Sequence, residues 1–341
     1  MQSNQRYTVS VNSRLFLRYT ELGTMQDSPR STVDFLLAYD WPFDAPFIRL
    51  LEGEFRAAGL SFLAVSPEKL SRAWDDLQTG RLTAFAFLDR ASDTDPEFLP
   101  LETWAKDNIP HIINPGPLRR RVWHKTNLHW EFIRAGVHTP HTIPLPALHQ
   151  MPVLDERPDI SPLGVPFSVK PDLGGGGWGV VTDARDWSDV EVARRRLPDD
   201  DLILQQFVTP ALLDGRRAWF RILYACDLVI PCWWDDQTHI FGHAVSIPER
   251  DRYQLAPLWD IAGTAARISQ LQLFSTEVGL AADGRFVAVD YVNDPVDLRV
   301  HPHAREGMPP DVAHRLAQAV TAYVRDLGAP SARERPPEWD S

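Results

Sequence analysis

The sequence predicts a protein of mixed class, in which an α/β domain with a parallel sheet precedes an α+β part with antiparallel strands. Three observations support this prediction. From Thr32 onward, strand-like segments alternate with amphipathic helical segments, which is typical of a parallel sheet with covered faces. Four consecutive glycines at 174–177 join two strand-like segments. Finally, an Asp-Gly pair at 283–284 lies between two alternating runs, which predicts a β-hairpin over 274–293.

The first domain is expected over residues 31–117. Its strands are predicted at TVDFLLAYD, SFLAVSP, LTAFAFLD and HIINP, where apolar residues form nearly continuous runs. Its helices are predicted at DAPFIRLLEGEFRAAGL, which Gly59 closes, and at PEKLSRAWDDLQ. Before this domain, residues 1–30 form an N-terminal extension with one alternating stretch that suits either a strand or a hairpin.

A second unit is expected over residues 118–203. One helix is predicted through RRRVWHKTNLHWEFIRAG, ending at Gly136. The proline-rich MPVLDERPDISPLGVP is predicted to be a loop or linker. Next come the strand FSVKP, the glycine run, the strand WGVVTD, a helix over 188–197 and the strand DLILQQFV.

A third unit is expected over residues 204–328. Its strands are predicted at AWFRILYA and LVIPCWW, which a turn at 226–227 separates, and in the hairpin at 274–293. A closing helix is predicted in PPDVAHRLAQAVTAYVRDLG, which has prolines at its start and a glycine at its end. The tail at 329–341 is predicted to be disordered.

The composition excludes several classes of protein. A net charge of −11 argues against a nucleic-acid partner. No apolar run approaches the roughly 18 residues that a membrane span needs, so no membrane partner is expected. The amino-terminal MQSNQRYTVSVNSRLF lacks the apolar core of a secretory signal, which favours a cytoplasmic location. Cys226 and Cys232 have no histidine at metal-ligand spacing, so neither a disulfide nor a zinc site is expected.

The glycine run needs a physical reason, because a glycine within a regular element costs roughly 0.5–1 kcal/mol relative to alanine. Gly174, Gly176 and Gly179 match the spacing of a dinucleotide-binding loop, but a strand rather than a helix follows them. The run also lacks the Gly-Lys-Ser/Thr ending of a P-loop. A hairpin tip with free backbone N–H groups remains, which can close over phosphate oxygens, with Lys170 adding a positive charge. The alternative is a glycine-rich surface turn.

The predicted hairpin places two acidic residues opposite each other. A two-residue turn at 283–284 makes Leu280 face Val287. In the same register, Glu277 faces Asp290. Like charges in such a pair destabilise a hairpin by roughly 0.2–1 kcal/mol. A compensating group is therefore expected beside the pair.

Glu277 and Asp290 share one face of the predicted hairpin, while the other face carries apolar side chains. Together with the amide oxygen of Asn293, the two carboxylates form a set of hard oxygen ligands that suits magnesium, which commonly bridges substrate phosphates. The alternative is an exposed acidic pair, or one bonded to an arginine such as Arg221 or Arg299.

In combination, Lys170 with its glycine loop, the strand leading into QQFV, and a hairpin with paired acids resemble the ATP-grasp superfamily. The resemblance covers about residues 117–328. It implies two α+β subdomains that close on ATP: a small lid subdomain with the glycine loop over 118–203, and a C-terminal subdomain with the metal site over 204–328. The strand-helix domain at 31–117 looks like the pre-ATP-grasp domain that usually precedes them.

The resemblance also implies roles for individual residues. HKTNLHWEFIRAGVHTPHT is similar to the segment whose lysine approaches the phosphates, and LILQQFV resembles the hinge that meets the adenine. The metal ligands would be Glu277, Asp290 and Asn293, binding magnesium or manganese. Arg221 or Arg299 would stabilise the transferring phosphoryl group or clamp a substrate carboxylate. The residues implied to contact ATP are Lys125, Lys170, Gly174, Gly175, Gly176, Gly177, Trp178, Gln205, Gln206, Val208 and Asp214.

The sequence departs from the family pattern at the metal site. The family spaces its last acid and asparagine as Glu-x-Asn, whereas here two residues separate Asp290 from Asn293. Strict alternation would turn Asn293 to the other face of the hairpin. A bulge near Val292 would bring it back, and otherwise Asp294 or a water would serve.

A second departure concerns the ribose. An acid often precedes Arg221 by two residues in the family, yet this chain has Trp219 there, and Asp214 is the expected substitute. The acceptor-binding signatures of D-alanine:D-alanine ligases and of ribosomal-protein glutamate ligases are also absent from the sequence. The subfamily, the identity of the substrates and the oligomeric state therefore stay open.

The implied function is that of an ATP- and magnesium-dependent carboxylate-amine ligase. Phosphoryl transfer from ATP to a carboxylate gives an acyl phosphate, which an amine attacks to form an amide or peptide bond. The partners would be a small-molecule acid and an amine, such as an amino acid or a peptide. One alternative is a small-molecule kinase on the same fold. Another is an ATP-binding regulatory protein without turnover, against which the retention of both lysines and both acids argues.

Overall fold

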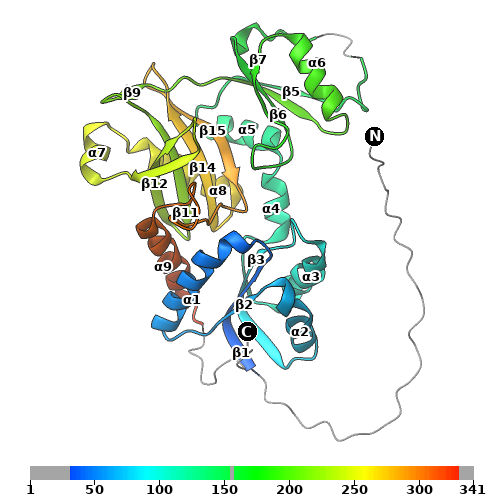
Figure 1. Ribbon diagram of the computed structural model, residues 1–341, viewed down its shortest axis with the longest axis vertical. Coiled ribbons are helices and arrows are strands. Elements are labelled where there is room, and N and C mark those ends of the chain that lie inside the picture. The colour runs from blue at the N-terminus through cyan, green and yellow to red at the C-terminus, as the bar shows by residue number, and fades with distance from the viewer. Residues whose placement is uncertain (1–30, 154–156, 330–341) are drawn as a thin grey trace, which may run out of the picture.

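The computed structural model describes residues 31–153 and 157–329. The expectations for the extension at 1–30 and for the tail from residue 330 onward lie outside these residues. Figure 1 shows three units along the long axis of the molecule: a sheet covered by helices at one end, a larger sheet in the middle, and a small sheet with one helix at the other end. Within the described ranges, no helix is both long and apolar enough to span a bilayer.

The first unit is the parallel α/β domain that the alternating pattern predicted. In chain order its elements are β1 (Ser31–Tyr39), α1 (Ala45–Ala57), β2 (Phe62–Val65), α2 (Pro67–Gln78), β3 (Leu82–Arg90), α3 (Leu99–Asn108) and β4 (His111–Ile113). The strand order is β2-β1-β3-β4, and all neighbours are parallel. Phe35 and Phe87 belong to separate cores on the two faces of this sheet, which explains the continuous apolar runs. Helix α3 is absent from the sequence prediction, because only Leu101 and Ala105 along it are buried.

The middle unit is an antiparallel sheet of order β13-β12-β11-β14-β15. Its elements are β11 (Trp219–Ala225), β12 (Leu228–Asp235), β13 (Ile240–Ala244), β14 (Leu273–Leu280) and β15 (Phe286–Asn293), with helices α4 (Gly116–Val122), α5 (Lys125–Arg134), α8 (Pro257–Ser269) and α9 (Pro310–Asp326) around it. Phe220, Phe274 and Tyr291 pack on the side of α4, α5 and α8. On the other face, Leu223 and Ile230 share a core with α9, which also contacts α1.

The third unit is a small antiparallel sheet of order β5-β8-β6-β7. Its elements are β5 (Thr142–Leu145), β6 (Phe167–Pro171), β7 (Val181–Ala184), α6 (Trp187–Arg196) and β8 (Leu202–Gln206). Phe167, Val190 and Leu204 form part of its own small core. Strand β8 runs across the expected domain boundary between residues 203 and 204, because it pairs with β5 and β6 along its whole length.

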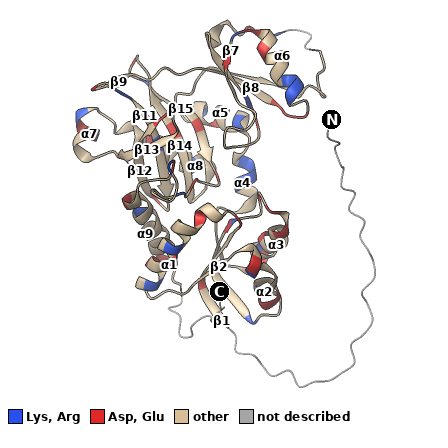
Figure 2. Cartoon of the chain, viewed as in Figure 1, with Lys and Arg blue, Asp and Glu red and all other residues tan. Residues whose placement is uncertain are grey.

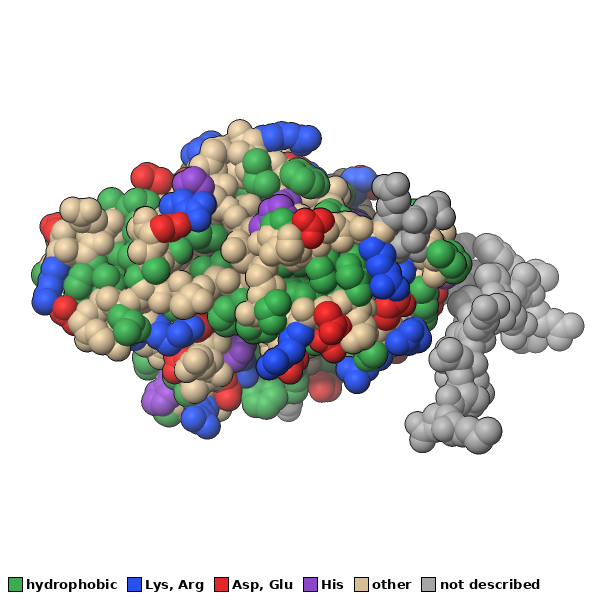
Figure 3. Space-filling model, turned by 90° about the horizontal axis from the view of Figure 1, so that it is seen from above, with side chains coloured by type: hydrophobic (Ala, Val, Ile, Leu, Met, Phe, Trp, Pro, Cys, Tyr) green, Lys and Arg blue, Asp and Glu red, His purple; other side chains and the backbone are tan. Residues whose placement is uncertain are grey.

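The remaining described elements are short. They are the strands β9 (Leu212–Leu213) and β10 (Arg216–Arg217), the helix α7 (Ile247–Arg252), and the single turns η1 (Pro42–Asp44), η2 (Pro96–Phe98) and η3 (Ser161–Leu163). Figure 3 shows that acidic and basic side chains are interspersed on the face seen from the end of the small sheet.

The single helix predicted through RRRVWHKTNLHWEFIRAG is wrong, because the chain breaks at 123–124 into α4 and α5. The break arises from a contact with the end of strand β6. The Asp172 carboxylate accepts a hydrogen bond from the Thr126 backbone N–H at 2.6 Å, and its backbone carbonyl accepts one from the Lys125 N–H at 3.1 Å. These bonds satisfy two free N–H groups at the start of α5, which stabilises a new helix N-terminus there.

Candidate active site

The connection between β14 and β15 sets the positions of the candidate metal ligands. It closes through a backbone bond from the Ala281 N–H to the Arg285 carbonyl at 2.8 Å, so three residues rather than two lie between the last bonded pair. Leu280 therefore faces Phe286, and the predicted pairing of Leu280 with Val287 is wrong. Both turn types accept an Asp-Gly pair, which is why the sequence pattern did not distinguish them.

The two acidic residues nevertheless lie opposite each other as predicted, because one extra residue in β15 after Ala288 restores their register. The carboxylate of Glu277 lies 3.4 Å from Arg221 Nη1 and accepts a hydrogen bond from Trp219 Nε1 at 3.2 Å. Burial raises the pKa of Glu277, Arg221 opposes this, and the carboxylate of Asp290 raises the pKa further. Arg221 thus partly compensates the repulsion between the two carboxylates, and a bound cation would compensate this repulsion further.

Asn293 lies on the same side of the hairpin as the acids. A second irregularity in the pairing places Asn293 opposite Ser275, and its Nδ2 donates to the Ser275 carbonyl at 3.4 Å. Since Ser275 and Glu277 are two residues apart on β14, their side chains share a face. The bulge expected near Val292 is therefore present.

Asp294 does not replace Asn293, because its carboxylate is buried and bonded elsewhere. It accepts from Arg119 Nε at 2.8 Å and from Asn114 Nδ2 at 2.6 Å. The candidate set is thus two carboxylates and one amide oxygen, which are hard oxygen donors of the kind that magnesium takes. Throughout the two described ranges, no group of three or more His, Cys, Asp or Glu side chains is arranged as a metal site. The donor set fits a magnesium ion that takes its other ligands from phosphate and water.

Two lysines from different units, one on α5 and one on β6, act on this acidic pair. Figure 2 shows charged side chains where α5 lies beside β15. Lys125 Nζ donates to two backbone carbonyls at the start of the glycine loop, at 2.5 and 3.3 Å, and Lys170 Nζ donates to Gln205 Oε1 at 2.7 Å. Burial lowers the pKa of both lysines, and the carboxylate of Asp290 opposes this at both of them. The lysines and the acids therefore share one electrostatic environment.

A chain of hydrogen bonds holds Lys170 in place. The ammonium group of Lys170 can only donate, so the amide oxygen of Gln205 accepts and its Nε2 donates to Tyr291 Oη at 3.3 Å. Burial lowers the pKa of His129 to about 4, so this imidazole is neutral at pH 7. Its Nδ1 is hydrogen-bonded to the Tyr291 hydroxyl at 2.8 Å. This series of hydrogen bonds joins the small sheet to β15 and α5. It uses the polar groups of the Gln205 side chain, which the sequence analysis assigned to adenine.

Replacing Tyr291 with phenylalanine is expected to loosen Gln205 and Lys170 without removing either. Since one hydrogen bond contributes about 0.5–1.5 kcal/mol, ATP affinity should fall by about twofold to tenfold. Isothermal titration calorimetry measures this change. Tyr323→Phe on α9 is the matched control and should leave ATP affinity unchanged. Equal ATP affinities for Y291F and the wild type would contradict the positioning role.

The glycine loop leaves open space around its Cα atoms, although Lys125 Nζ bonds the Gly174 carbonyl. Gly174, Gly176 and Gly177 have φ values of 110°, 62° and 74°, which other residues rarely adopt. A Cβ atom at any of these positions would meet no atom within 4 Å, so backbone conformation rather than crowding requires glycine. Trp178, at the end of the run, is 64% exposed. An exposed large aromatic ring beside a flexible loop is able to cover a ligand when the loop closes.

The fluorescence of Trp178 should change when ATP and magnesium are added together. If the loop closes, the indole ring moves from water into a less polar site, and its emission shifts to shorter wavelength. The difference between wild-type and Trp178→Phe spectra isolates this signal from the other tryptophans. An unchanged difference spectrum, with nucleotide binding shown by calorimetry, would remove Trp178 from the lid.

The residues predicted to form the hinge lie between the small and the middle sheet. Gln206 ends β8, and its side-chain oxygen accepts from the His141 backbone N–H at 3.3 Å. Val208 is buried in the core that also contains Trp219. Trp219 stands where an acid was sought for the ribose and instead donates to Glu277.

Arg299 is held in an ion pair rather than left free for a substrate. Its Nη2 lies 2.7 Å from the Asp297 carboxylate, and its Nη1 lies 3.2 Å from that of Glu306. The guanidinium also lies over the Trp41 ring, 5.6 Å from its centroid.

Asp214 does not join the other nucleotide candidates. It lies in the exposed turn between β9 and β10, where its carboxylate is 2.5 Å from Arg252 Nη2 and accepts from the Tyr253 hydroxyl at 2.7 Å. The expectation that Asp214 replaces the ribose ligand is not supported by this placement, because both of its partners belong to the end of α7.

Sequence reasoning missed Asp172, Tyr291 and His129, which orient the two lysines. The Asp172 carboxylate lies 3.0 Å from His124 Nδ1, in addition to its bond with the start of α5. A signal for Asp172 exists in the sequence, since an acid directly follows the predicted strand FSVKP. Tyr291 and His129 meet only through the packing of α5 on β15, which no local pattern shows.

No family model matches this chain, and no curated protein matches it in sequence. Solved structures match it in fold. The RimK domain protein ATP-grasp from Sphaerobacter thermophilus is 20% identical over 85% of this chain and 98% of its own, with a TM-score of 0.56. D-alanine–D-alanine ligase from Bacillus anthracis, complexed with ATP, is 12% identical over 87% and 95%, with a TM-score of 0.55. The ATP-grasp ligase PsnB, complexed with minimal precursor, Mg and ADP, is 13% identical over 86% and 98%, with a TM-score of 0.54.

Proposed function

Because this chain has the ATP-grasp fold, we propose that it is an ATP- and magnesium-dependent ligase that joins a carboxylate to an amine. One observation carries the proposal. The cross-strand carboxylates of Glu277 and Asp290 lie within electrostatic reach of Lys170, and Asp290 also lies within reach of Lys125, which bonds the first carbonyl of the glycine run. A paired anionic and cationic site of this kind suits a nucleotide triphosphate with its divalent ion.

In this proposal the cationic residues bind phosphate and the anionic residues bind magnesium. Lys125 and Lys170 would hold phosphate oxygens, and the N–H groups of the glycine loop would cover them. Magnesium, held by Glu277, Asp290 and Asn293, would supply neutralisation of phosphate charge. Phosphoryl transfer needs position and charge balance more than a covalent protein group, which agrees with the absence of a nucleophile from this proposed set.

Arg221 is the candidate for contact with the reacting groups. Its guanidinium lies between Glu277, at 3.4 Å, and the Trp234 ring, at 4.9 Å from the centroid. A planar guanidinium in this position can bond two oxygens of a phosphoryl group or of a carboxylate. The carboxylate would attack the γ-phosphorus of ATP and release ADP. The amine would then attack the acyl carbon, form the C–N bond and release inorganic phosphate.

Product analysis tests the proposal against its alternatives. A ligase releases ADP and inorganic phosphate only when an acid and an amine are both present, and a new amide appears by mass spectrometry. A small-molecule kinase releases ADP and a stable phosphorylated acceptor. ATP binding without turnover, across a broad panel of amino acids and peptides, would replace the ligase by a regulatory ATP-binding protein.

A further inference from the structure

Trp219 lies beside the candidate metal ligand Glu277, at a position where the sequence analysis sought an acid for the ribose. Its side chain is 7% exposed, and its ring shares a core with Val208 of the predicted hinge. The indole Nε1–H donates to Glu277 Oε2 at 3.2 Å. An indole has a single N–H and no acceptor, so this bond uses the whole hydrogen-bonding capacity of the side chain.

The register of two strands brings the indole to the carboxylate. In the pairing of β11 with β14, Trp219 lies opposite Gly279, and Arg221 lies opposite Glu277. Trp219 and Glu277 are therefore diagonal neighbours on one face of the sheet, a separation that a long aromatic side chain can span. The contact thus depends on a ring that extends across the position of Gly279.

A glycine makes room for this diagonal contact. A Cβ atom on Gly279 would lie 2.9 Å from Trp219 Cε3 and 3.0 Å from Trp219 Cζ3. Unlike the glycines at 174, 176 and 177, Gly279 does not have a left-handed backbone conformation. Crowding rather than backbone conformation therefore requires glycine here, because any side chain at position 279 would displace the buried indole.

The two oxygens of the Glu277 carboxylate have different partners. Oε2 accepts the bond from Trp219, whereas Oε1 lies 3.4 Å from Arg221 Nη1. Arg221 has other donors, and its Nε donates to Ser275 Oγ at 3.3 Å. A guanidinium with five N–H groups can also bond a substrate oxygen, whereas the indole has no N–H left to donate. Trp219 is therefore the dedicated partner of Glu277, and Arg221 is a shared one.

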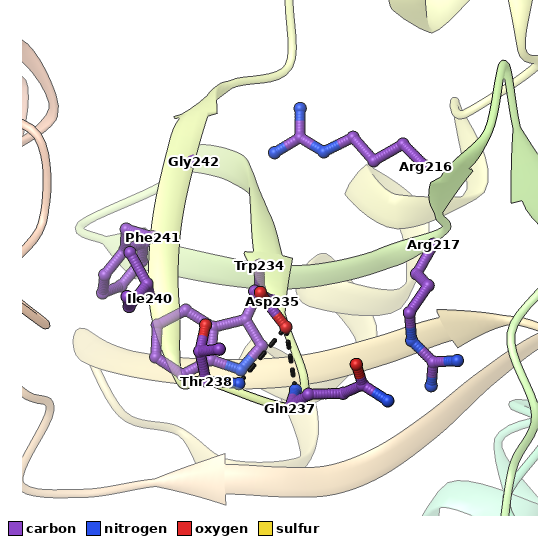
Figure 4. A pocket seen from close by; sticks show the side chains of 9 residues that line it. All are labelled: Arg216, Arg217, Trp234, Asp235, Gln237, Thr238, Ile240, Phe241 and Gly242. Carbon is purple, nitrogen blue, oxygen red and sulfur yellow. Dashed lines mark hydrogen bonds between the residues drawn. The ribbon is translucent and has the colours of Figure 1, made fainter.

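The aromatic rings on the other side of Arg221 bond neither acid of the site. The rings of Trp234 and Phe241 have their centroids 4.9 and 5.8 Å from the guanidinium carbon. Figure 4 shows both residues on the β12–β13 hairpin, where they line a pocket of about 320 Å³. In the described part of the chain, the buried Trp234 Nε1–H has no hydrogen-bond partner. Of these two tryptophans, only Trp219 therefore acts on Glu277.

We propose that Trp219 is a positioning residue of the magnesium site, which holds the Glu277 carboxylate in the orientation that binds the ion. A carboxylate has about four lone-pair sites, so two N–H donors still leave room for a cation. Donors that bond a metal ligand orient it, and their loss typically weakens metal binding by about 10-fold to 100-fold. This inference rests on the proposed function, in which Glu277 is a metal ligand.

Trp219→Phe tests the role, because phenylalanine keeps an aromatic ring at this position and loses the N–H. Calorimetric titration of ATP into the full chain, in magnesium and in EDTA, separates orientation of the metal ligand from packing. In magnesium, W219F should bind ATP about tenfold more weakly than the wild type. In EDTA the two proteins should bind ATP equally, because no ion then depends on the orientation of Glu277. Trp104→Phe, on α3 of the parallel domain, is the matched control and should change neither affinity.

Gly279→Ala tests the same bond from the opposite strand. Its methyl group displaces the indole without removing the N–H, so G279A should show the same loss of ATP affinity in magnesium and none in EDTA. Gly53→Ala on α1, where a Cβ meets nothing within 4 Å, is the control for this variant and should leave both affinities unchanged. Because the two substitutions act independently, either folded variant decides the result.

Unchanged ATP affinity of W219F or G279A in magnesium would overturn the role of Trp219. An equal loss in magnesium and in EDTA would also overturn it, because that pattern indicates a general effect on the nucleotide site. A wild-type protein whose ATP affinity is the same in magnesium and in EDTA would refute the metal site itself. Tighter binding in magnesium that the wild type and both variants share would leave the metal site in place and remove Trp219 from it.

Discussion

Glu277→Gln is expected to lower the rate of ATP-dependent product formation by about 100-fold to 1,000-fold, the size of effect seen when one preorganised charge contact is lost from an active site. Glutamine keeps the oxygen that accepts from Trp219 Nε1 at 3.2 Å, but it loses the negative charge shared with Asp290. The variant should therefore bind magnesium and the triphosphate with lower affinity. Steady-state assays of ADP release measure the loss.

The same substitution should leave the fold at least as stable. Burial raises the pKa of Glu277 above its ordinary value of 4.5, so the folded state binds a proton more tightly than the unfolded state. The free energy of unfolding therefore falls as the pH rises from 4.5 through the folded-state pKa of Glu277, and a neutral glutamine removes this loss. At neutral pH, relief of the like-charge pair should stabilise the fold by roughly 0.2–1 kcal/mol.

Opposite changes in activity and stability separate a ligand-binding acid from a structural one. Asp283→Asn, in the exposed turn of the same hairpin, is the matched control, because within residues 31–153 and 157–329 its carboxylate bonds Arg285 and no other residue. It should change neither activity nor stability measurably. An E277Q protein with wild-type turnover, or one that unfolds at a lower temperature, would refute the assignment of Glu277.

Arg119→Met is expected to destabilise the fold by about 3–5 kcal/mol, the usual cost of removing one partner from a buried ion network. Arg119 lies 2.8 Å from Asp89 of β3 and 2.8 Å from Asp294 after β15, and 3.2 Å from Asp93. It therefore joins the parallel domain to the middle sheet. Without it, three buried carboxylates lose the cation that bonds all of them. Urea unfolding measures the loss.

The pH dependence of the loss identifies its cause. Burial already raises the pKa of Asp294, and Arg119 opposes that rise. Removing the arginine raises the folded-state pKa further, so the variant loses more stability as the pH rises. The deficit should be larger at about pH 8 than at about pH 5. Arg120→Met, whose side chain is 52% exposed, should cost less than about 0.5 kcal/mol, and an equal cost for both variants would contradict this account.

The parallel domain could be predicted from the sequence because its strands are buried on both faces. Continuous apolar runs such as DFLLA leave little choice other than a covered strand. Helix α8 was missed although its buried residues, from Leu258 to Ser269, follow a helical spacing. It contains a glycine and several residues of modest helix propensity, which weaken the local preference for a helix.

The acidic pair could be predicted although the turn was not. The expected two-residue turn is one residue shorter than the real one, and the extra residue in β15 cancels the difference before Glu277. Irregularities of this kind arise from packing of the whole sheet, so the sequence specifies them only weakly. The bulge near Val292 was predictable because the chemistry demanded that Asn293 share a face with Asp290.

Contacts between distant segments were the least predictable part of the site. The break before Lys125 depends on Asp172, 47 residues further along the chain. The position of Lys170 depends on Gln205 and Tyr291, and the partners of Asp214 come from α7. Local patterns locate such residues on elements, whereas their pairing follows from how the elements pack.

The central claim is that the acidic pair anchors a divalent ion through which ATP is bound. Calorimetric titration of ATP in magnesium and in EDTA, on the wild type and on Asp290→Asn, tests it directly. The account predicts that magnesium strengthens ATP binding at least tenfold in the wild type and far less in D290N. ATP affinity that is the same in magnesium and EDTA, or the same gain from magnesium in both proteins, would contradict it.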